Sequence, residues 1–419
     1  MIFFPSHEIH DRLRVELAGV FIDRSLNPPH LWLVAKLPTN LIREIRAGAG
    51  VSLLAWMVEI DDNLIAAFGL RVYDDQAAPR TFFGSCRSDE EAADLRAVLA
   101  AGSVPLQIHN ENFLPLLSVE CKFDPEPARP ALALVPSALC PDEQGFRLRE
   151  RANDVVEELL AGNARPRIKA LSDLPLFFER VESLRVHVAG SGEIALDDPD
   201  EGGELERLTF QAFDSLFPFG AFHSPQVGEG KKRRELCDVL AVSRVRELEN
   251  EGVFVIQNKV ASAFPEGLKR KTSRRAKSIQ NNITDGIRQL EGAIKALLAG
   301  QRVYRDPAGT PLEADPPEVA GQVKPLNLRE RAAQIGQGIV LISDMHEEVD
   351  WEAVFFALGK VFLSTRYYCH VVDLQELARL ITHSKGRPAL LESLLLRRGK
   401  EMLKNKTALV RFHFVGGKY

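Results

Sequence analysis

The pattern of apolar and polar residues is most regular between residues 231 and 300. Two apolar segments, 236–242 and 253–260, have the length and the β-branched content of strands. A helical stripe follows, and we expect it to cover one face of a sheet that contains both strands. The stripe consists of Ala276, Ile279, Ile283, Ile287, Leu290, Ile294 and Leu297, and the helix is predicted to end at Gly300.

Polar residues interrupt both predicted strands. Asp238 lies in the first, and the triplet Gln257-Asn258-Lys259 lies in the second. Because side chains alternate between the faces of a strand, Asp238 is expected on the face of its apolar neighbours Leu236, Leu240 and Val242, and Gln257 is expected on the face of Lys259. Burying a carboxylate, an amide and an ammonium is costly unless they pair with one another, with a metal ion or with water. The alternatives are a solvated strand end with an Asp238–Lys259 ion pair, or a functional site.

The pattern upstream predicts an α+β unit that extends to residue 136. The turn residues Asp61-Asp62-Asn63 indicate a hairpin, and Ser88 is a candidate helix N-cap. The polar cluster around His109 is interpreted as an ordinary turn, and we expect an antiparallel arrangement of the strands. Strands are predicted at 51–60, 64–73, 81–86, 104–109 and 116–123, and helices at 40–46 and 88–102.

Four prolines between residues 125 and 136 indicate a domain boundary. We interpret residues 137–202 as a linker with a helix near 144–160 and an acidic loop, and residues 203–419 as one domain. Its later segments predict strands at 338–343 and 368–372 and a helix at 374–381. The strand–helix–strand order implies a parallel pairing in the same sheet.

A further predicted helix precedes the Asp238 strand and carries two candidate acids. Glu206 recurs with Phe210, Phe213 and Phe217 on one stripe of this helix. Glu204 aligns with the apolar Leu208 on a neighbouring stripe. We favour Glu206 as the functional acid and retain Glu204 as the alternative.

An acid on one strand, a Q-x-K triplet on the next and a helix after it resemble the core of the PD-(D/E)XK nucleases, a restriction-endonuclease-like superfamily. The Q-x-K form resembles the Mrr-like enzymes, and the resemblance covers roughly residues 203–298. Cys237 stands where the signature has proline, and Gln257 stands where an acid is usual. The resemblance implies an α/β fold with a restriction-endonuclease-like mixed sheet flanked by helices and preceded by the α+β domain.

The same resemblance implies a Mg²⁺-dependent (or Mn²⁺-dependent) endonuclease that acts on DNA. Asp238, the side-chain oxygen of Gln257, the backbone carbonyl of Asn258 and Glu206 are the expected metal ligands. Lys259 is expected to orient the attacking water or to offset negative charge in the transition state. Two alternatives remain open: an inactive nuclease fold that binds nucleic acid or assembles with partner proteins, and a nuclease subunit of a phage-defence or transposition complex.

Positive charge is concentrated around this region although the chain has a net charge of -5. Residues 228–280 hold thirteen Lys or Arg against seven Asp or Glu. Such a cluster is suited to phosphate contacts, although solvated loops have similar composition. The candidate nucleic-acid contacts are Lys231, Lys232, Arg233, Arg234, Lys269, Arg270, Lys271, Arg274, Arg275 and Lys277.

Composition and motifs restrict the remaining possibilities. The five cysteines form no C-x-x-C pair, which argues against a disulfide framework or a zinc knuckle. No apolar run approaches the ~20 residues of a membrane span and the N-terminal residues do not resemble a signal peptide, so we expect a cytoplasmic protein without a membrane partner. A homo-oligomer is compatible with the sequence.

Overall fold

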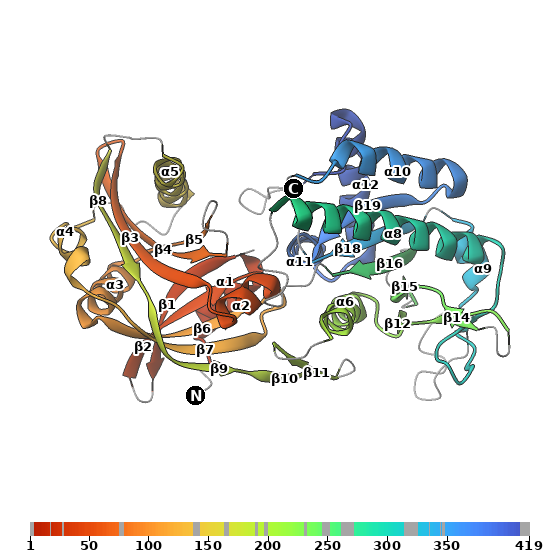
Figure 1. The fold of residues 1–419 in the computed structure, drawn as a ribbon, viewed down its shortest axis with the longest axis horizontal. Coiled ribbons are helices and arrows are strands. Elements are labelled where there is room, and N and C mark those ends of the chain that lie inside the picture. Colours follow the sequence, from red (N-terminus) through yellow and green to blue (C-terminus); the bar gives the residue numbers. More distant parts are fainter. Residues whose placement is uncertain are drawn as a thin grey trace. The chain divides into compact units, whose positions relative to one another are not determined.

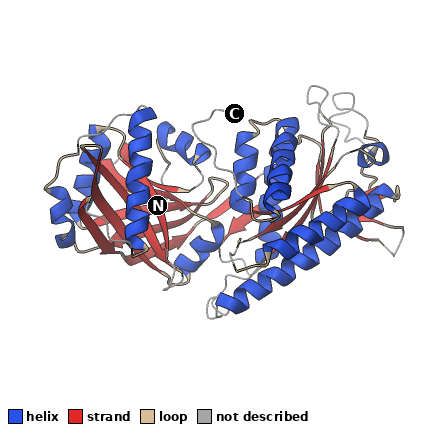
Figure 2. Cartoon of the chain, turned by 90° about the horizontal axis from the view of Figure 1, so that it is seen from above, coloured by secondary structure: helices blue, strands red, loops and turns tan. Residues whose placement is uncertain are grey.

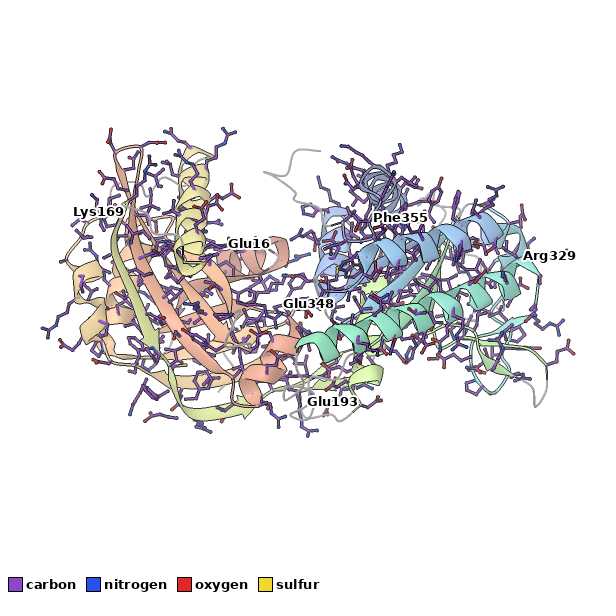
Figure 3. The ribbon with its side chains drawn as sticks, turned by 45° about the horizontal axis from the view of Figure 1, so that its top comes forward. Glu16, Lys169, Glu193, Arg329, Glu348 and Phe355 are labelled. Atoms are coloured by element: carbon purple, nitrogen blue, oxygen red, sulfur yellow. The ribbon has the colours of Figure 1, made fainter. Side chains whose placement is uncertain are left out.

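The structure is a computed structural model of the 419-residue chain. It describes residues 4–16, 18–26, 29–74, 79–136, 143–162, 167–188, 192–196, 200–229, 233–244, 252–260, 272–313, 326–334, 336–343, 345 and 348–410. The chain is a mixed α/β protein that divides into two compact units (Figures 1 and 2). The first unit is Met1–Val186 with Ala195–Asp197 and Val415–Tyr419, and the second is His187–Ile194 with Asp198–Phe414. In Figure 3, Glu16 and Lys169 mark the first unit, and Arg329 and Phe355 mark the second.

Two sheets form the framework of the first unit. One has the order β1-β2-β6-β7-β9 and the other has the order β5-β4-β3-β8. The strands of the first sheet are β1 (Gly19–Leu26), β2 (Pro29–Lys36), β6 (Ser103–His109), β7 (Pro115–Lys122) and β9 (Phe177–Ser183). Those of the second are β3 (Gly50–Ile60), β4 (Asn63–Tyr73), β5 (Arg80–Ser85) and β8 (Ile168–Pro175). The helices of this unit are α1 (His7–Val15), α2 (Thr39–Arg46), α3 (Asp89–Ala101), η1 (Glu126–Ala128), α4 (Arg129–Leu132) and α5 (Glu143–Leu160).

Local signals in this unit produce the elements that the sequence predicts. Asp61 and Asp62 both have positive φ, as a tight two-residue hairpin turn requires, and they join β3 to β4. The Ser88 side chain accepts a hydrogen bond from the Glu91 N–H at the start of α3, and the helix ends at the left-handed Gly102. The expectation of a wholly antiparallel unit is wrong, because β2 pairs with β6 in parallel. The β1–β2 hairpin, which contributes strand β2 to this pairing, was not predicted.

The predicted linker helix is α5, and its apolar side is part of the core of the first unit. Leu148, Ala152, Val155 and Val156 pack in one cluster with residues of β3 and β4 such as Trp56. Two further strands, β8 and β9, are not predicted from the sequence. Strand β8 pairs with β3 in one sheet, and β9 pairs with β7 in the other. The first compact unit thus includes α5, β8 and β9, and its long segment extends to Val186.

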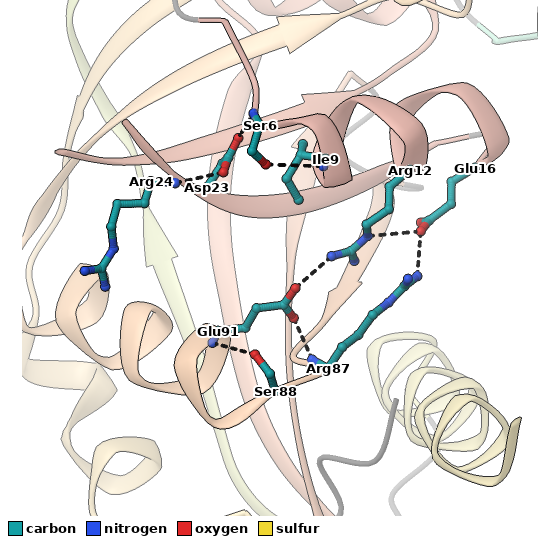
Figure 4. A network of polar contacts seen from close by, with 9 residues as sticks. All are labelled: Ser6, Ile9, Arg12, Glu16, Asp23, Arg24, Arg87, Ser88 and Glu91. Carbon is teal, nitrogen blue, oxygen red and sulfur yellow. Dashed lines mark hydrogen bonds and ion pairs between the residues drawn. The ribbon is translucent and has the colours of Figure 1, made fainter. Parts of the chain in front are cut away.

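Ion pairs attach α1 to the beginning of α3 (Figure 4). The Arg12 guanidinium contacts Glu91 at 3.0 Å and Glu16 at 3.4 Å, and Arg87 contacts Glu16 at 2.8 Å. Arg12 is 8% exposed, so its pairing with Glu91 satisfies a charge that is largely removed from water. This network fixes the N-terminal helix against the sheets.

The polar cluster around His109 is largely buried, and most of its polar groups form hydrogen bonds. His109 Nδ1 contacts the Phe113 carbonyl at 2.9 Å, and burial lowers the pKa of His109 to about 4. The Lys36 ammonium donates to the carbonyls of Leu13 and Glu16, and burial lowers its pKa to about 7. These partners agree with the structural interpretation of the cluster.

One mixed five-stranded sheet organises the second unit. Its order is β12-β15-β16-β18-β19, with β12, β15 and β16 antiparallel and β16, β18 and β19 parallel. The strands are β12 (Ala221–His223), β15 (Val239–Val242), β16 (Val253–Lys259), β18 (Gln337–Ile342) and β19 (Tyr368–Asp373). Smaller sheets are β10 (Arg185–Val188) with β11 (Gly192–Ala195), and β14 (Arg234–Glu235), β13 (Gln226–Val227) and β17 (Val303–Tyr304).

Helices cover both faces of this sheet (Figure 1). Helices α8 and α10 share one core cluster with Val255, Val340 and Val371. On the other face, rings of α6 pack against Phe254 and Arg398 of α12 reaches His370. The described helices are α6 (Glu201–Leu216), α8 (Thr272–Leu298), α9 (Leu328–Ala332), α10 (Trp351–Thr365), α11 (Leu374–His383) and α12 (Pro388–Asn405).

The predicted apolar stripe of α8 is confirmed, since all seven of its residues are buried. The strands and helices predicted after residue 337 correspond to β18, β19 and α11, and the predicted parallel pairing is present. Among the described helices, none combines the length and the apolar composition that a membrane crossing requires.

Candidate functional site

Asp238 lies immediately before β15 and is fixed beside β16. Its N–H donates to the Ile256 carbonyl at 3.2 Å, although Val239 is already the register partner of Ile256. Two successive residues thus align with one partner residue, as in a β-bulge. The Asp238 Oδ2 atom accepts a hydrogen bond from the backbone N–H of Asn258.

The predicted strand alternation is therefore correct for only part of the first segment. Leu236, Leu240 and Val242 share one core cluster, as predicted. Asp238 lies outside the regular strand, since β15 begins at Val239. Its carboxylate is placed by its hydrogen bond to the backbone of β16 and not by the simple alternation of faces.

The Q-x-K triplet occupies the end of β16, and its side chains alternate between the two helical layers. The Asn258 side chain faces α6, where the Thr209 hydroxyl donates to Asn258 Oδ1 at 3.0 Å. Gln257 and Lys259 share the face that α8 covers. Gln257 is buried and Lys259 is half-buried. The backbone N–H of Asn258 points toward Asp238, so its carbonyl points to the same side of the strand.

Helix α8 positions Lys259 through a glycine. A Cβ atom at Gly286 would lie 2.7 Å from Val340 Cγ1 and 3.3 Å from Lys259 Cγ, so only glycine allows this close approach. The Asn282 amide also donates to the Val260 carbonyl at 2.9 Å. Glycine inside a helix costs about 1 kcal/mol relative to alanine, and here it allows α8 to pack directly on the lysine stem.

Glu206 is the helix acid that influences Asp238. It is half-buried on α6, and its Oε2 atom lies 3.6 Å from Nε2 of His223 on β12. Its negative charge raises the pKa of Asp238. Glu204 is buried on the stripe of α6 that packs into the unit. The predicted stripe through Glu206 is thus only partly buried, because Phe213 and Phe217 lie in the core while Phe210 is half-buried.

Electrostatics set Asp238 apart from the other acids of the site. Burial raises the pKa of Asp238 from 3.8 to about 7, and repulsion from Glu206 and Glu235 adds to this effect. The Asn258 N–H and the positive charge of Lys259 act in the opposite direction. Within the described residues, Asp238 and Lys259 form no direct ion pair, so the simple strand-end pair of these two residues is not formed.

The raised pKa of Asp238 predicts a pH-dependent stability difference in metal-free protein. A carboxyl group that ionises near pH 7 when folded and near pH 4 when unfolded favours the folded state at low pH. This contribution is lost as the pH rises from about 4 to 7, and it amounts to on the order of 2–4 kcal/mol. Asp238→Asn is therefore expected to gain free energy of unfolding over the wild type across this pH range.

Urea unfolding of both proteins at pH 4.5 and pH 8 in the presence of EDTA measures this difference. The matched control is Asp285→Asn, which removes an exposed carboxylate of α8. If the difference in free energy of unfolding between the wild type and Asp238→Asn stays constant with pH, the raised pKa of Asp238 is contradicted.

The predicted basic residues fall into two groups. Arg233 is half-buried, stacks over Tyr304 at 4.4 Å and donates to the Pro307 carbonyl at 3.1 Å, whereas Arg234 and Lys277 are exposed. Arg233 therefore has a structural role in the small sheet. Lys231, Lys232, Lys269, Arg270 and Lys271 lie outside the described residues, as do the side chains of Arg274 and Arg275.

The donor set at the site is compatible with a hard divalent cation. The Asp238 and Glu206 carboxylates, the Gln257 amide oxygen and the Asn258 carbonyl are all oxygen donors of the kind that Mg²⁺ and Mn²⁺ prefer. Burial, together with the charges of Glu206 and Glu235, raises the pKa of Asp238 and so disfavours its ionised form, an effect that a bound cation would offset. Within the described ranges no three His, Cys, Asp or Glu side chains gather into a metal-binding group.

Two neighbours of Asp238 were not predicted from the sequence. His223 lies opposite Val239 on β12, and Ser224 N–H donates to the Asp238 carbonyl at 2.8 Å. Glu235 on β14 contributes to the raised pKa of Asp238. Glu235 lies three residues before Asp238 and was open to sequence reasoning, whereas His223 required the strand pairing.

No protein-family model matches the chain, and comparisons with curated proteins and with solved structures found no significant similarity. The fold and the site therefore define the protein as a mixed α/β chain of two compact units with a polar, partly buried constellation at one strand end of the second unit.

Proposed function

We propose that the second unit is a Mg²⁺- or Mn²⁺-dependent endonuclease that hydrolyses phosphodiester bonds in DNA. The observation that carries this proposal is the hydrogen bond from the Asn258 N–H, inside the Q-x-K triplet, to the Asp238 carboxylate, on which the charges of Glu206 and Lys259 also act. The resemblance to restriction-endonuclease-like nucleases supports the proposal, because it assigns an acid, a Q-x-K triplet and a helix acid to one site. The mixed sheet flanked by helices is compatible with that fold.

Each residue has a role that follows from its position. Asp238, Glu206, Gln257 Oε1 and the Asn258 carbonyl would hold the cation, which when bound acidifies a water and stabilises charge on the phosphate. Lys259 lies outside direct ion-pairing distance of Asp238 in the described residues, so its ammonium is available to orient the attacking water or to offset the charge that develops on the phosphate. Gly286 allows α8 to lie close to the lysine stem.

The decisive experiment is a cleavage assay on purified protein. Supercoiled, linear and single-stranded DNA are each incubated with Mg²⁺, with Mn²⁺ and with EDTA. Metal-dependent cleavage supports the proposal. Metal-independent binding without any cleavage replaces it with the alternative, an inactive nuclease-like module that binds nucleic acid or assembles with partner proteins.

Binding of duplex DNA is expected to depend steeply on salt. Replacing Arg274, Arg275 and Lys277 together with alanine is expected to lower affinity and to flatten the slope of log K against log[salt] by up to about 2.7, since each phosphate contact contributes ~0.9. Fluorescence anisotropy between 50 and 200 mM salt measures this slope, and three phosphate contacts correspond to roughly 40-fold in affinity over that range.

The matched control for this triple variant removes three exposed cations of the first unit, Lys122, Lys169 and Arg180, whose side chains are 59%, 48% and 64% exposed. If both triple variants retain the wild-type slope, the cluster near the beginning of α8 is a solvated segment without phosphate contacts.

A further inference from the structure

Helix α10 presents apolar side chains on both of its sides. Its inner stripe packs on the sheet and includes Trp351, Val354, Leu358 and Val361, all of which are buried. On its outer side, Phe356 is 54% exposed and Leu363 is 73% exposed. Figure 1 shows α10 beside α8 on the outside of the sheet, and Ser364 of α10 donates to Glu291 of α8 at 3.0 Å. Single exposed apolar residues are common, so the patch gains meaning only from its surroundings.

Charges flank this outer stripe in a symmetric way. Glu352 and Lys360 lie four residues before and four residues after Phe356, which places each about one helical turn, or ~6 Å, from it on the same side of the helix. Both are exposed, and within the described part of the chain neither belongs to an ion pair. The stripe therefore has opposite charges at equal distances from an exposed aromatic ring.

We propose that two copies of this chain associate through α10 in an antiparallel helix pair, with the two-fold axis passing at Phe356. Around this axis the two Phe356 rings meet, and Glu352 of each copy lies opposite Lys360 of the other. A parallel pair would instead bring Glu352 against Glu352 and Lys360 against Lys360. The charge pattern thus selects the antiparallel, self-complementary arrangement that a two-fold interface requires.

Small residues on the same side permit close approach of the two helices. Gly359 has open space where a Cβ would be, and it falls opposite the exposed Ala353 of the second copy in this register. Antiparallel alignment also places each helix N-terminus beside the C-terminus of the other, which the helix dipoles favour. The surface is one helix wide and smaller than the ~1,600 Å² of a standard interface, so we expect a weak dimer with a dissociation constant on the order of micromolar.

Analytical ultracentrifugation of the full chain tests this surface by charge exchange. The wild type is expected to dimerise at concentrations up to ~100 μM, well above a micromolar dissociation constant. Glu352→Lys and Lys360→Glu, made separately, should each weaken the dimer about tenfold, because each creates two like-charge contacts per dimer. The double variant that carries both changes should regain wild-type affinity.

A cysteine at the two-fold axis provides an independent readout. Phe356→Cys is expected to form an intermolecular disulfide under mild oxidation, because the two copies of this position meet. Leu403→Cys on α12 is the matched control, since Leu403 is 63% exposed and lies on another helix. The four cysteines in the described ranges are buried.

A wild type that is monomeric at these concentrations overturns the proposal. It is equally overturned if the double charge-exchange variant remains as weak as the single variants, or if the Leu403→Cys control crosslinks as fast as Phe356→Cys. Circular dichroism melting of every variant separates loss of association from loss of folding. Cleavage activity is not needed for any of these readouts, so they are independent of the proposed nuclease function.

Discussion

Asp238→Ala is expected to abolish divalent-metal binding and to reduce DNA cleavage by on the order of 10³-fold or more, because bound metal contributes several kcal/mol of charge stabilisation in such reactions. The Asp238 carboxylate accepts a hydrogen bond from the Asn258 N–H inside the Q-x-K triplet, and the charge of Glu206 acts on it. Its removal leaves Glu206 as the single carboxylate among the four proposed ligands. The fold should persist, because the variant removes a buried carboxylate whose ionisation is unfavourable.

Isothermal titration with Mn²⁺ and single-turnover cleavage measure the two losses side by side. Asp238→Asn retains an acceptor for the Asn258 N–H and isolates the charge, so it should keep the fold and lose most of the metal affinity. Asp285→Ala on the exposed side of α8 is the control for a lost carboxylate. Unchanged metal binding in Asp238→Ala contradicts the assignment of this residue as a ligand.

Lys259→Ala is expected to separate catalysis from metal binding. Cleavage should fall ~10²-fold, on the order of 3 kcal/mol, since one positioned charge that acts on the transition state typically contributes that much. Metal affinity should be unchanged or higher, because the ammonium repels a cation and supplies no ligand. The protein should remain folded, since the lysine stem is only half-buried.

Single-turnover cleavage rates at saturating Mg²⁺, with metal affinity measured on the same preparation, test this separation. Lys404→Ala, which removes a 74% exposed lysine of α12, is the matched control. Equal cleavage by Lys259→Ala and wild type excludes a catalytic role for Lys259. A variant that loses metal and activity together indicates a collapsed site and contradicts the separation of roles.

Patterns with short range in the sequence predict several elements of both units. The seven-residue apolar stripe of α8 and the continuous apolar run of β18 are buried as expected, because a helix or strand with an apolar face must cover it with another element. The tight turn at Asp61 and Asp62 and the cap at Ser88 follow from local backbone chemistry. Such signals depend on residues that are close in the chain.

The arrangement of the candidate site required contacts between distant residues. Alternation along the chain assigned Asp238 to a strand face, whereas the structure places it before β15 with its carboxylate on the backbone of Asn258, twenty residues away. The helical period of α6 already favoured Glu206 over Glu204, but its electrostatic effect on Asp238 follows from how α6 packs on the sheet. The presence of His223 follows from the pairing of β12, which no periodic pattern contains.

The organisation of the first unit has the same origin. Helix α5 has the amphipathic pattern of a linker helix, and its sequence does not reveal that its apolar side packs on β3 and β4. The parallel pairing of β2 with β6 joins segments about 70 residues apart, as the register of Lys36 with His109 shows. Local sequence thus specifies which segments are helices, strands and turns. The pairing of strands, the domain boundary and the neighbours of Asp238 depend on burial and hydrogen bonding across the folded chain. Proximity in the sequence does not identify the partners that satisfy this burial and hydrogen bonding.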